Sequence, residues 1–329
     1  MGASGATGLL EYLLLPRWRQ SATPAQRVAN GDRSVAAGAT SPGSRRRPNP
    51  TQGDFELSAS TVRYFGVEKA ASEPSRLRRW AYRLLGEIHI SGRIRLYHVI
   101  REIGALGLPE AGVTFLDAGT ARGDVALHFA RMRPQWRVRG IDLDSDSVKR
   151  CQSASKALTL TNVRFECGNL LTLRESETYD LVTCSDVLEH IEDDHHAVAN
   201  LARSLKPGGR LVLTFPADPS RRHLRLLHWL ERRRGGVPSG VVGHVREGYD
   251  PSSAAELAEA AGLEVVKIRW TYGFFGTLAH DLFFIFGDSD ANPIAFVLAL
   301  PALLGLSFLE GRTKIMSGSA LLLVARKPA

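Results

Sequence analysis

The sequence predicts an α/β fold with a doubly wound, mostly parallel sheet of seven strands. Short apolar runs alternate with segments in which apolar residues recur every three or four positions, as in amphipathic helices. One run, FLDAGTARGDVALHFA (Phe115–Ala130), passes through two glycines directly into a helical segment. This strand–turn–helix order is typical of sheets that bind nucleotides. A hydrophobic content of 44% with 23% charged residues indicates a chain able to bury a globular core.

Seven apolar runs are expected to form the strands. Most are short and rich in Val, Ile, Leu or Phe, which suits strands that are buried on both faces. In chain order they are Val113–Asp117, Val138–Asp142, Val163–Glu166, Tyr179–Ser185, Gly208–Pro216, Glu264–Trp270 and Ala320–Ala325. Strands separated by helical segments in this way are those of a Rossmann-like sheet.

Helices are expected between the strands, at Gly123–Arg133, Ser145–Leu158, His195–Leu205 and Ser252–Gly262. The last of these is predicted to begin with a capping box of Ser253 and Glu256 and to end at a glycine. Two amphipathic helices are expected before the first strand. Their apolar stripes are Leu77, Trp80, Ala81, Leu84 and Leu85 in one, and Leu96, Val99, Ile100 and Ile103 in the other.

Composition divides the chain into three parts. Residues 21–53 contain almost no large apolar residue, so they cannot bury enough surface to offset the entropy of ordering. We predict a disordered tail over residues 1–53, an N-terminal helical lid over 54–110, and a main domain over 111–329 with a hydrophobic insertion at about 275–312. The alternative for the Arg- and Ser-bearing, acid-poor tail is an organelle transit peptide.

The positive charge of the chain is concentrated in this tail. Of the formal net charge of +8, residues 1–53 contribute +5, from seven arginines against Glu11 and Asp32. The remainder is therefore close to neutral, which argues against a nucleic-acid surface on the folded part.

The three cysteines are widely spaced and include no C-x-x-C pair. Such a set favours neither a disulfide framework nor a zinc site. No secretory signal is recognisable, because Glu11 interrupts the first apolar run and no basic residue precedes it. We therefore expect a reduced, cytoplasmic protein. The cysteines are Cys151, Cys167 and Cys184.

The turn after the first strand predicts a nucleotide-type cofactor site. In doubly wound sheets, ligands bind where the carboxyl ends of central strands meet. Gly119 and Gly123 allow close approach of the backbone to a ligand. Asp142 ends the second strand, where an acid can accept both ribose hydroxyls. The G-x-G-x-x-G pattern of NAD enzymes fails, since positions 121 and 124 are not glycine.

The turn resembles the first motif of class I S-adenosylmethionine-dependent methyltransferases, an acid followed by G-x-G-x-G, with alanine at the middle glycine. Further stretches resemble later motifs of this family in the same order: GIDLDSDSV, VRFECGNLL, YDLVTCSDVLEHIED and LKPGGRLVLTFP. GHVREGYDPSSAAELAEAAGLEV resembles the segment that leads into the penultimate strand. The resemblance covers about Arg93–Trp270 and the last strand, and the ordered series of motifs makes it specific.

The resemblance implies that the chain binds S-adenosylmethionine. Asn169 stands where the family usually has Asp, so it keeps an acceptor for the adenine amino group but lacks the charge. Ala121 adds a methyl group where backbone and cofactor approach, which we expect to lower affinity without abolishing the site. The implied cofactor-binding residues are Asp117, Gly119, Ala121, Gly123, Asp142, Leu143, Asn169, Leu170, Ser185 and Val187.

Three residues are candidates for catalysis. Methyl transfer from a sulfonium mainly needs alignment of the reactants and exclusion of water, and a base is required only for a hydroxyl or acidic carbon acceptor. His190 and Glu189, in SDVLEH after the fourth strand, and His244 in GHVREGY are the candidate catalytic groups. The alternative is that the first two shape the pocket and that the loop histidine binds the backbone.

EDDHH (Glu192–His196) has the composition of a metal cluster but is interpreted as the start of a helix. Adjacent histidines on a helix point in different directions. Asp193 and Asp194 suit the positive end of a helix dipole. We therefore expect no metal site in this chain.

The segment before the last strand carries more apolar surface than a short connection needs. Residues 291–309 are uncharged and nearly long enough to span a bilayer. Pro301 interrupts them, and a crossing would separate the last strand from its sheet. We expect a buried or membrane-touching cap over a lipophilic acceptor, with aromatic surface from Phe274, Phe275, Phe283, Phe284, Phe296 and Phe308.

A second basic segment, RRHLRLLHWLERRR (Arg221–Arg234), places six arginines beside leucines at helical spacing. Such a helix could contact anionic lipid or RNA. The alternative is a solvated face whose long side chains cover the core.

The predicted function is S-adenosylmethionine-dependent methyl transfer to oxygen or carbon of a small, lipophilic acceptor, with peripheral membrane contact. An RNA or protein methyltransferase is one alternative. Nucleic acid is not the expected partner, because SDVLEH replaces the (Asp/Asn)-Pro-Pro-(Tyr/Phe) motif that resemblance to amino-directed nucleic-acid enzymes would require. The other alternative, a binding protein without turnover, is kept open by Ala121.

Overall fold

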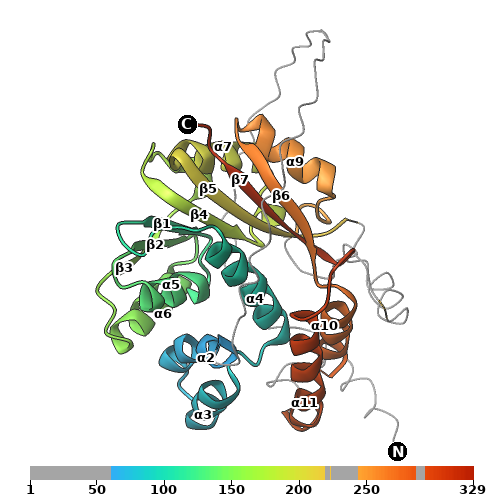
Figure 1. Cartoon of the computed structure of the whole chain (residues 1–329). Coiled ribbons are helices and arrows are strands. Elements are labelled where there is room, and N and C mark those ends of the chain that lie inside the picture. Colours follow the sequence, from blue (N-terminus) through green and yellow to red (C-terminus); the bar gives the residue numbers. More distant parts are fainter. Residues whose placement is uncertain (1–60, 219–222, 224–243, 287–292) are drawn as a thin grey trace, which may run out of the picture. The chain divides into compact units, whose positions relative to one another are not determined.

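Seven strands form one mixed sheet at the centre of the structure (Figure 1). The computed structural model describes residues 61–218, 223, 244–286 and 293–329. The strand order is β3-β2-β1-β4-β5-β7-β6. The strands β1 to β5 run parallel, and β7 runs antiparallel to both of its neighbours. This confirms the predicted fold. The bounds are β1 Thr114–Ala118, β2 Arg137–Asp142, β3 Val163–Cys167, β4 Tyr179–Ser185, β5 Leu205–Pro216, β6 Glu264–Thr271 and β7 Ala320–Arg326.

Helices connect the parallel strands and set the position of the ligand edge. The helices α5 (Asp124–Met132) and α6 (Ser145–Ala157) follow β1 and β2, and α7 (Asp194–Ser204) precedes β5. After β3 the chain returns through the short 3₁₀ helix η1 (Leu170–Thr172) to pair β4 with the free side of β1. The topology therefore reverses between β1 and β4, which is where doubly wound sheets bind ligands.

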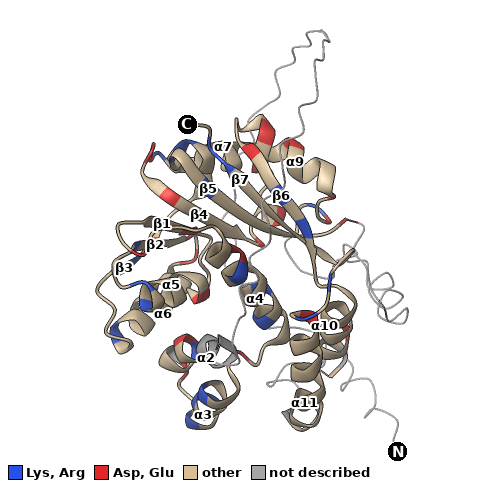
Figure 2. Ribbon diagram, viewed as in Figure 1, with Lys and Arg blue, Asp and Glu red and all other residues tan. Residues whose placement is uncertain are grey.

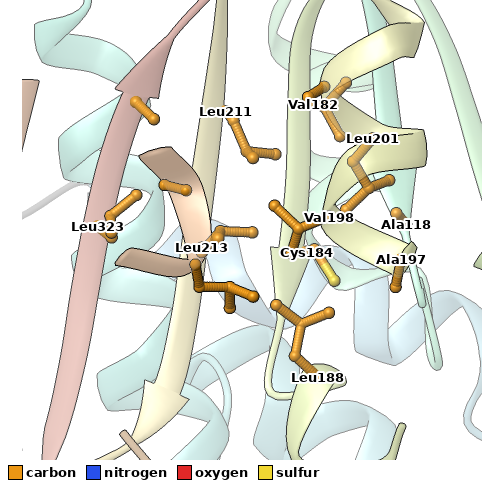
Figure 3. Packing of buried hydrophobic residues seen from close by; sticks show 14 of the residues in the cluster. Ala118, Val182, Cys184, Leu188, Ala197, Val198, Leu201, Leu211, Leu213 and Leu323 are labelled. Carbon is orange, nitrogen blue, oxygen red and sulfur yellow. The ribbon is translucent and has the colours of Figure 1, made fainter. Parts of the chain in front are cut away.

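The core lies between the sheet and its helices. Figure 3 shows one side of it, where side chains of β4, β5 and β7 pack against α7. Each large side chain that is fully buried contributes about 1.5–3 kcal/mol. Cys184 belongs to this cluster and behaves there as a small apolar residue. The labelled residues are Ala118, Val182, Cys184, Leu188, Ala197, Val198, Leu201, Leu211, Leu213 and Leu323.

The helix before β6 begins one residue earlier than the predicted Ser252. In α9 (Pro251–Ala260) the N-cap is Asp250, whose side chain accepts from the Ser253 amide at 3.0 Å, while the Ser253 hydroxyl accepts from the Asp250 amide at 3.0 Å. The predicted box of Ser253 and Glu256 is therefore wrong. Asp caps a helix as well as Ser does, and Pro251 at the first helical position favours the earlier start.

Three helices precede the sheet: α2 (Thr61–Ser72), α3 (Arg76–Leu85) and α4 (Ile90–Ala105). Both predicted helices, now α3 and α4, are confirmed, but only the stripe of α4 is buried in the main core. Three of the five residues of the α3 stripe face outward, with Leu77 76%, Trp80 61% and Leu84 51% exposed, while Leu85 packs against a hydrophobic cluster. Tyr82, on another face of α3, makes the buried contact.

Ion pairs fix α2 beside the start of α5. The Lys69 ammonium lies 2.7 Å from an Asp124 oxygen, and the Arg131 guanidinium lies 2.9 Å from a Glu68 oxygen. The residue Asp124 follows the glycine turn of β1 directly. The helix α2 therefore reaches the edge where the cofactor is expected.

The hydrophobic insertion forms two helices, α10 (Phe274–Phe286) and α11 (Pro293–Glu310), and Pro301 lies inside α11. Within the described residues, no helix is both long and apolar enough to cross a membrane. The rings of Phe283 and Phe296 are buried and meet edge to face with centroids 6.2 Å apart. These two rings thus form the core of the cap itself, whereas Phe274 is 60% exposed.

A buried polar network joins α4, β6 and the cap. The Glu102 carboxylate accepts from Arg269 at 2.9 Å, and Arg269 also lies 3.0 Å from Nδ1 of His98. The Nε2 atom of His98 lies 3.4 Å from Glu310, whose carboxylate accepts from the Gly273 amide at 2.7 Å. Burial lowers the pKa of His98 to about 4. The neutral imidazole can then accept from the guanidinium and donate to the carboxylate.

All described helices and strands belong to one unit, Leu57–Ala329. The predicted tail over residues 1–53 lies outside the described residues, as does the basic segment Arg221–Arg234 apart from His223.

Candidate active site

The glycine turn after β1 is shaped to bring its backbone close to a ligand. The amides of Gly119 and Thr120 both donate to the Ile141 carbonyl at 2.9 Å, which ties the turn to the end of β2. Gly119 has φ 73°, and a Cβ atom there would lie 2.3 Å from Cγ2 of Val187. Glycine is therefore required at this position, both for its φ angle and for the space that the valine takes.

Ala121 keeps the geometry of a glycine although it carries a side chain. Its φ is 46°, in the left-handed region, which costs a residue with a Cβ atom about 1–2 kcal/mol. Its amide donates to Oδ2 of Asp142 at 2.7 Å. This charge-assisted bond offsets part of the strain, so the turn retains its shape without the middle glycine.

Asp142 and Leu143 lie beside this turn at the end of β2. The second carboxylate oxygen of Asp142 accepts from the Asp144 amide at 2.9 Å. Each carboxylate oxygen can accept more than one hydrogen bond, so capacity for a ribose hydroxyl remains. The Leu143 side chain is 76% exposed and offers apolar surface next to the carboxylate. A polar acceptor beside an apolar face fits a nucleoside.

Asp117 and Ser185 lie at the carboxyl ends of the two central strands, β1 and β4. The buried Asp117 carboxylate accepts from the hydroxyls of Thr120 at 2.6 Å and Thr183 at 2.7 Å. Burial raises the pKa of Asp117. The Asp117 carboxylate therefore fixes the turn through its hydrogen bond with Thr120. The hydroxyl oxygen of Ser185 is buried without a hydrogen-bond partner, as expected of a group that lines a ligand site.

Asn169 and Leu170 lie at the end of β3. The Asn169 side-chain oxygen accepts from the Leu171 amide at 2.9 Å and caps η1. The Leu170 side chain is buried in the core, so only its backbone is left to meet a cofactor. The structure thus brings all the predicted cofactor residues to the carboxyl ends of β1, β2, β3 and β4. Their side chains and backbone groups are of the types that a nucleoside cofactor needs.

The three predicted catalytic residues come together from two segments. Glu189 and His190 lie in the 3₁₀ helix η2 (Leu188–His190) after β4. The Val245 amide donates to the Glu189 carbonyl at 2.9 Å, and this bond holds the later segment against η2. The rings of His190 and His244 meet edge to face with centroids 4.6 Å apart.

The surroundings give these residues different protonation states. Burial, together with the charge of Asp186, raises the pKa of Glu189 to about 8. One of its oxygens is buried without a hydrogen-bond partner. Burial and the charge of His190 lower the pKa of His244. At neutral pH the carboxyl group is therefore largely protonated, and His244 is an uncharged imidazole able to accept a proton.

The same three side chains have the spacing of a possible metal site. Their ligand atoms all lie within 4.8 Å of one another, and a carboxylate with two imidazoles is a set that zinc accepts. The EDDHH stretch, in contrast, starts α7 as predicted. Asp193 is its N-cap and accepts from the His196 amide at 3.0 Å.

Three residues of the site were not among the predicted ones. Arg95 of α4 reaches Asp186 with a nitrogen–oxygen distance of 2.8 Å, and Asp186 follows β4 with φ 51°. Tyr272, buried after β6, also has φ 51° and donates from its hydroxyl to the Ser91 carbonyl at 2.5 Å. Asp186 lies within SDVLEH but was not among the predicted site residues, and no motif marks Arg95 or Tyr272. They meet because α4 crosses the edge of the sheet.

A cavity of about 290 Å³ has Gly273, the residue after Tyr272, in its lining. It lies between the start of α10 and the segment that leads into β7, at the same edge of the sheet as the carboxyl end of β6. Its walls combine aromatic rings with a few polar groups, which suits a largely apolar ligand. The lining residues are His223, Gly273, Phe274, Phe275, Thr277 and residues 313–318.

Comparison with known families finds one model, described as a methyltransferase domain, that matches residues 91–268. The match begins at the start of α4 and ends within β6. It therefore includes the glycine turn, η2 and the segment of His244.

Two curated proteins resemble this chain over about half of its length. A ubiquinone biosynthesis O-methyltransferase of Coxiella burnetii is 24% identical over 182 residues, which are 55% of this chain and 74% of that protein. A protein of the same description from Neisseria meningitidis is 25% identical over 190 residues, or 57% of this chain and 76% of its own length.

Among solved structures, a Galdieria sulphuraria protein assigned as a sarcosine dimethylglycine methyltransferase has a TM-score of 0.52 with 17% sequence identity. The match covers 76% of this chain and 97% of that one. At this identity the likeness concerns the fold, a mostly parallel sheet with flanking helices.

Proposed function

The chain belongs to the methyltransferase-domain family and is an S-adenosylmethionine-dependent methyltransferase, and we propose that it methylates a hydroxyl oxygen or an acidic carbon of a small lipophilic acceptor. One observation carries the choice of acceptor atom. An uncharged imidazole, His244, lies against His190 beside the cofactor edge. Methyl transfer to an amine that is already uncharged would not need such a base.

We propose that S-adenosylmethionine lies across the carboxyl ends of β1 and β4. Asp142 would accept from the ribose hydroxyls, Leu143 would cover one face of the adenine, and Asn169 would face its amino group. Gly119 and Val187 would lie against the part of the cofactor that bears the sulfur. When bound, the cofactor supplies a methyl group on a sulfonium, a good leaving group.

The base in this proposal is His244. It would take the proton of the acceptor as its oxygen or carbon attacks the methyl carbon. Glu189 stays protonated below its pKa of about 8, so it would serve as a hydrogen-bond donor that orients a neighbour. Arg95, paired with Asp186 at 2.8 Å, would close the side of the site below α4 and help to exclude water.

A lipophilic acceptor is supported by the surroundings of the site. The cavity lined by Gly273 has Phe274 and Phe275 in its wall, so it would hold an apolar part of the acceptor while the reacting atom points to His244. The exposed side of α11 is apolar as well, with Ile294 74% and Leu298 76% exposed. The named relatives act in ubiquinone biosynthesis, which agrees with an acceptor of this class.

The test is incubation of the protein with labelled S-adenosylmethionine and four acceptor classes. These are a phenol with a long alkyl chain, a short water-soluble phenol, total RNA and total protein. We expect label in the long-chain phenol above all. Label in RNA or protein alone would overturn the proposal. Cofactor binding by calorimetry without label in any fraction would identify a binding protein without turnover.

A further inference from the structure

The helix α3 is the feature of the described residues that the proposed function leaves unused. It is short, it follows α2, and it packs on the domain through Tyr82, which belongs to the same hydrophobic cluster as Phe283 and Phe296 of the cap. Leu85, at the end of the helix, packs against the same cluster. Leu77, Trp80 and Leu84 are more than half exposed.

These three residues form one continuous stripe. Their spacing of three and four positions places them on the same face of the helix, opposite Tyr82. An exposed tryptophan between two exposed leucines is unusual on a soluble surface, where large apolar groups occur singly. The stripe therefore needs a partner surface that accepts apolar side chains.

The charge of α3 defines that partner. The helix RLRRWAYRLL contains four arginines and no acid, and by helical spacing Arg76 and Arg83 lie next to the stripe. Figure 2 shows the basic residues on α3 and the almost uncharged α11. A tryptophan and leucine stripe with flanking arginines is the pattern of helices that lie in the interface of an anionic bilayer.

We propose that α3 docks this protein on an anionic phospholipid surface, with Leu77, Trp80 and Leu84 inserted among the acyl chains. Arg76 and Arg83 would lie on the headgroup phosphates. This inference rests on the proposed function and names the surface from which the lipophilic acceptor is taken. Because α3 and α11 share one cluster, docking through α3 would bring the apolar side of the cap to the same membrane.

Two other occupants of this face fit less well on charge. A second copy of the chain would bring four more arginines against the first four. The residues before the helix would also bring positive charge, since residues 1–53 contain seven arginines and two acids. A lipid surface supplies both the missing negative charge and the apolar interior.

The experiment is vesicle flotation of the full chain with phosphatidylcholine alone or mixed with phosphatidylglycerol. We expect binding to the mixed vesicles that falls about tenfold or more in Arg76→Gln/Arg83→Gln, from the loss of two charges at the surface. Leu77→Ser/Trp80→Ser/Leu84→Ser should abolish it. Val266→Ser, an exposed valine of β6, is the matched control and should bind like the wild type.

Equal binding to neutral and anionic vesicles, or full binding by the triple variant, would overturn the proposal. If the wild type is a dimer and the triple variant is a monomer, the stripe binds a second copy of the chain instead. Melting temperature and turnover of the short, water-soluble phenol should be the same in the triple variant and the wild type. If wild type floats but transfers no methyl group, the proposed function fails while the docking surface stands.

Discussion

The imidazole of His244 lies edge to face against that of His190, with ring centroids 4.6 Å apart. The two rings are brought together by the bond from the Val245 amide to the Glu189 carbonyl. Two histidines at this distance do not both carry a positive charge readily, because like charges repel. The contact therefore favours an uncharged imidazole beside the cofactor turn, as a proton acceptor requires.

Replacing His244 by Gln should lower turnover by about 10²–10⁴-fold, the usual worth of a general base, and leave cofactor affinity unchanged. His196→Gln, at an exposed position of α7, is the control and should keep full activity. Steady-state kinetics and cofactor calorimetry measure the two effects. Full turnover by the folded His244 variant would exclude it as the base.

The rate should also depend on pH in a way that this histidine explains. Its pKa is lowered below the ordinary 6.5 by burial and by His190, and only the uncharged ring accepts a proton. The wild-type rate should therefore be constant between about pH 6.5 and pH 8, where Glu189 remains protonated, and fall at lower pH. A pH–rate profile of His244→Gln should lack this acid limb. An unchanged limb would assign it to another group.

Exhaustive treatment with a chelator distinguishes a role of His244 as the base from a role of Glu189, His190 and His244 as metal ligands. If His244 acts as the base, turnover survives chelation, because no step depends on an ion. Loss of activity that a divalent cation restores would instead identify Glu189, His190 and His244 as its ligands, as their spacing within 4.8 Å permits.

Asp142→Ala should weaken cofactor binding by about 1.5–3 kcal/mol, because a charge-assisted pair of hydrogen bonds is lost. The same change frees the Ala121 amide, so part of the loss comes from a looser turn. Asp146→Ala, an exposed acid on α6 paired with Lys149, is the matched control. Unaltered affinity in a folded Asp142→Ala protein would place the ribose elsewhere.

Ala121→Gly should stabilise the fold and tighten cofactor binding. Relief of the left-handed strain is worth about 1–2 kcal/mol, and the greater freedom of glycine in the unfolded chain removes about 0.4–1 kcal/mol of it. Denaturant unfolding should therefore show a gain of about 0.5–1 kcal/mol. Thr159→Gly, at a φ of 56° after α6, should gain stability without any change in cofactor affinity.

His98 should make the fold sensitive to acid. Its pKa falls from 6.5 to about 4 in the folded protein, so below pH 6.5 the unfolded chain binds a proton that the folded chain does not. Stability is complete above that pH and is lost as the pH falls toward 4. The loss is at most about 3 kcal/mol. Unfolding curves at several pH values should show that the advantage of wild type over His98→Gln shrinks by this amount.

A good part of the fold and of the cofactor edge follows from the sequence alone. Apolar periodicity identifies strands such as Tyr179–Ser185, and an acid before a glycine turn identifies the ligand edge. The periodicity and the glycine turn are local patterns, because each is set by the backbone geometry and the burial of a single short segment. The order of the segments then restricts the sheet to few topologies.

Tertiary structure alone decided which surfaces are covered and which distant residues meet. A stripe in the sequence shows that a helix has an apolar face, but burial depends on neighbours from elsewhere in the chain. Trp80 was therefore left exposed while Phe283 became core. Tertiary packing also forms the pairs of Arg95 with Asp186 and of His190 with His244. No local periodicity in the sequence indicates such contacts between distant segments.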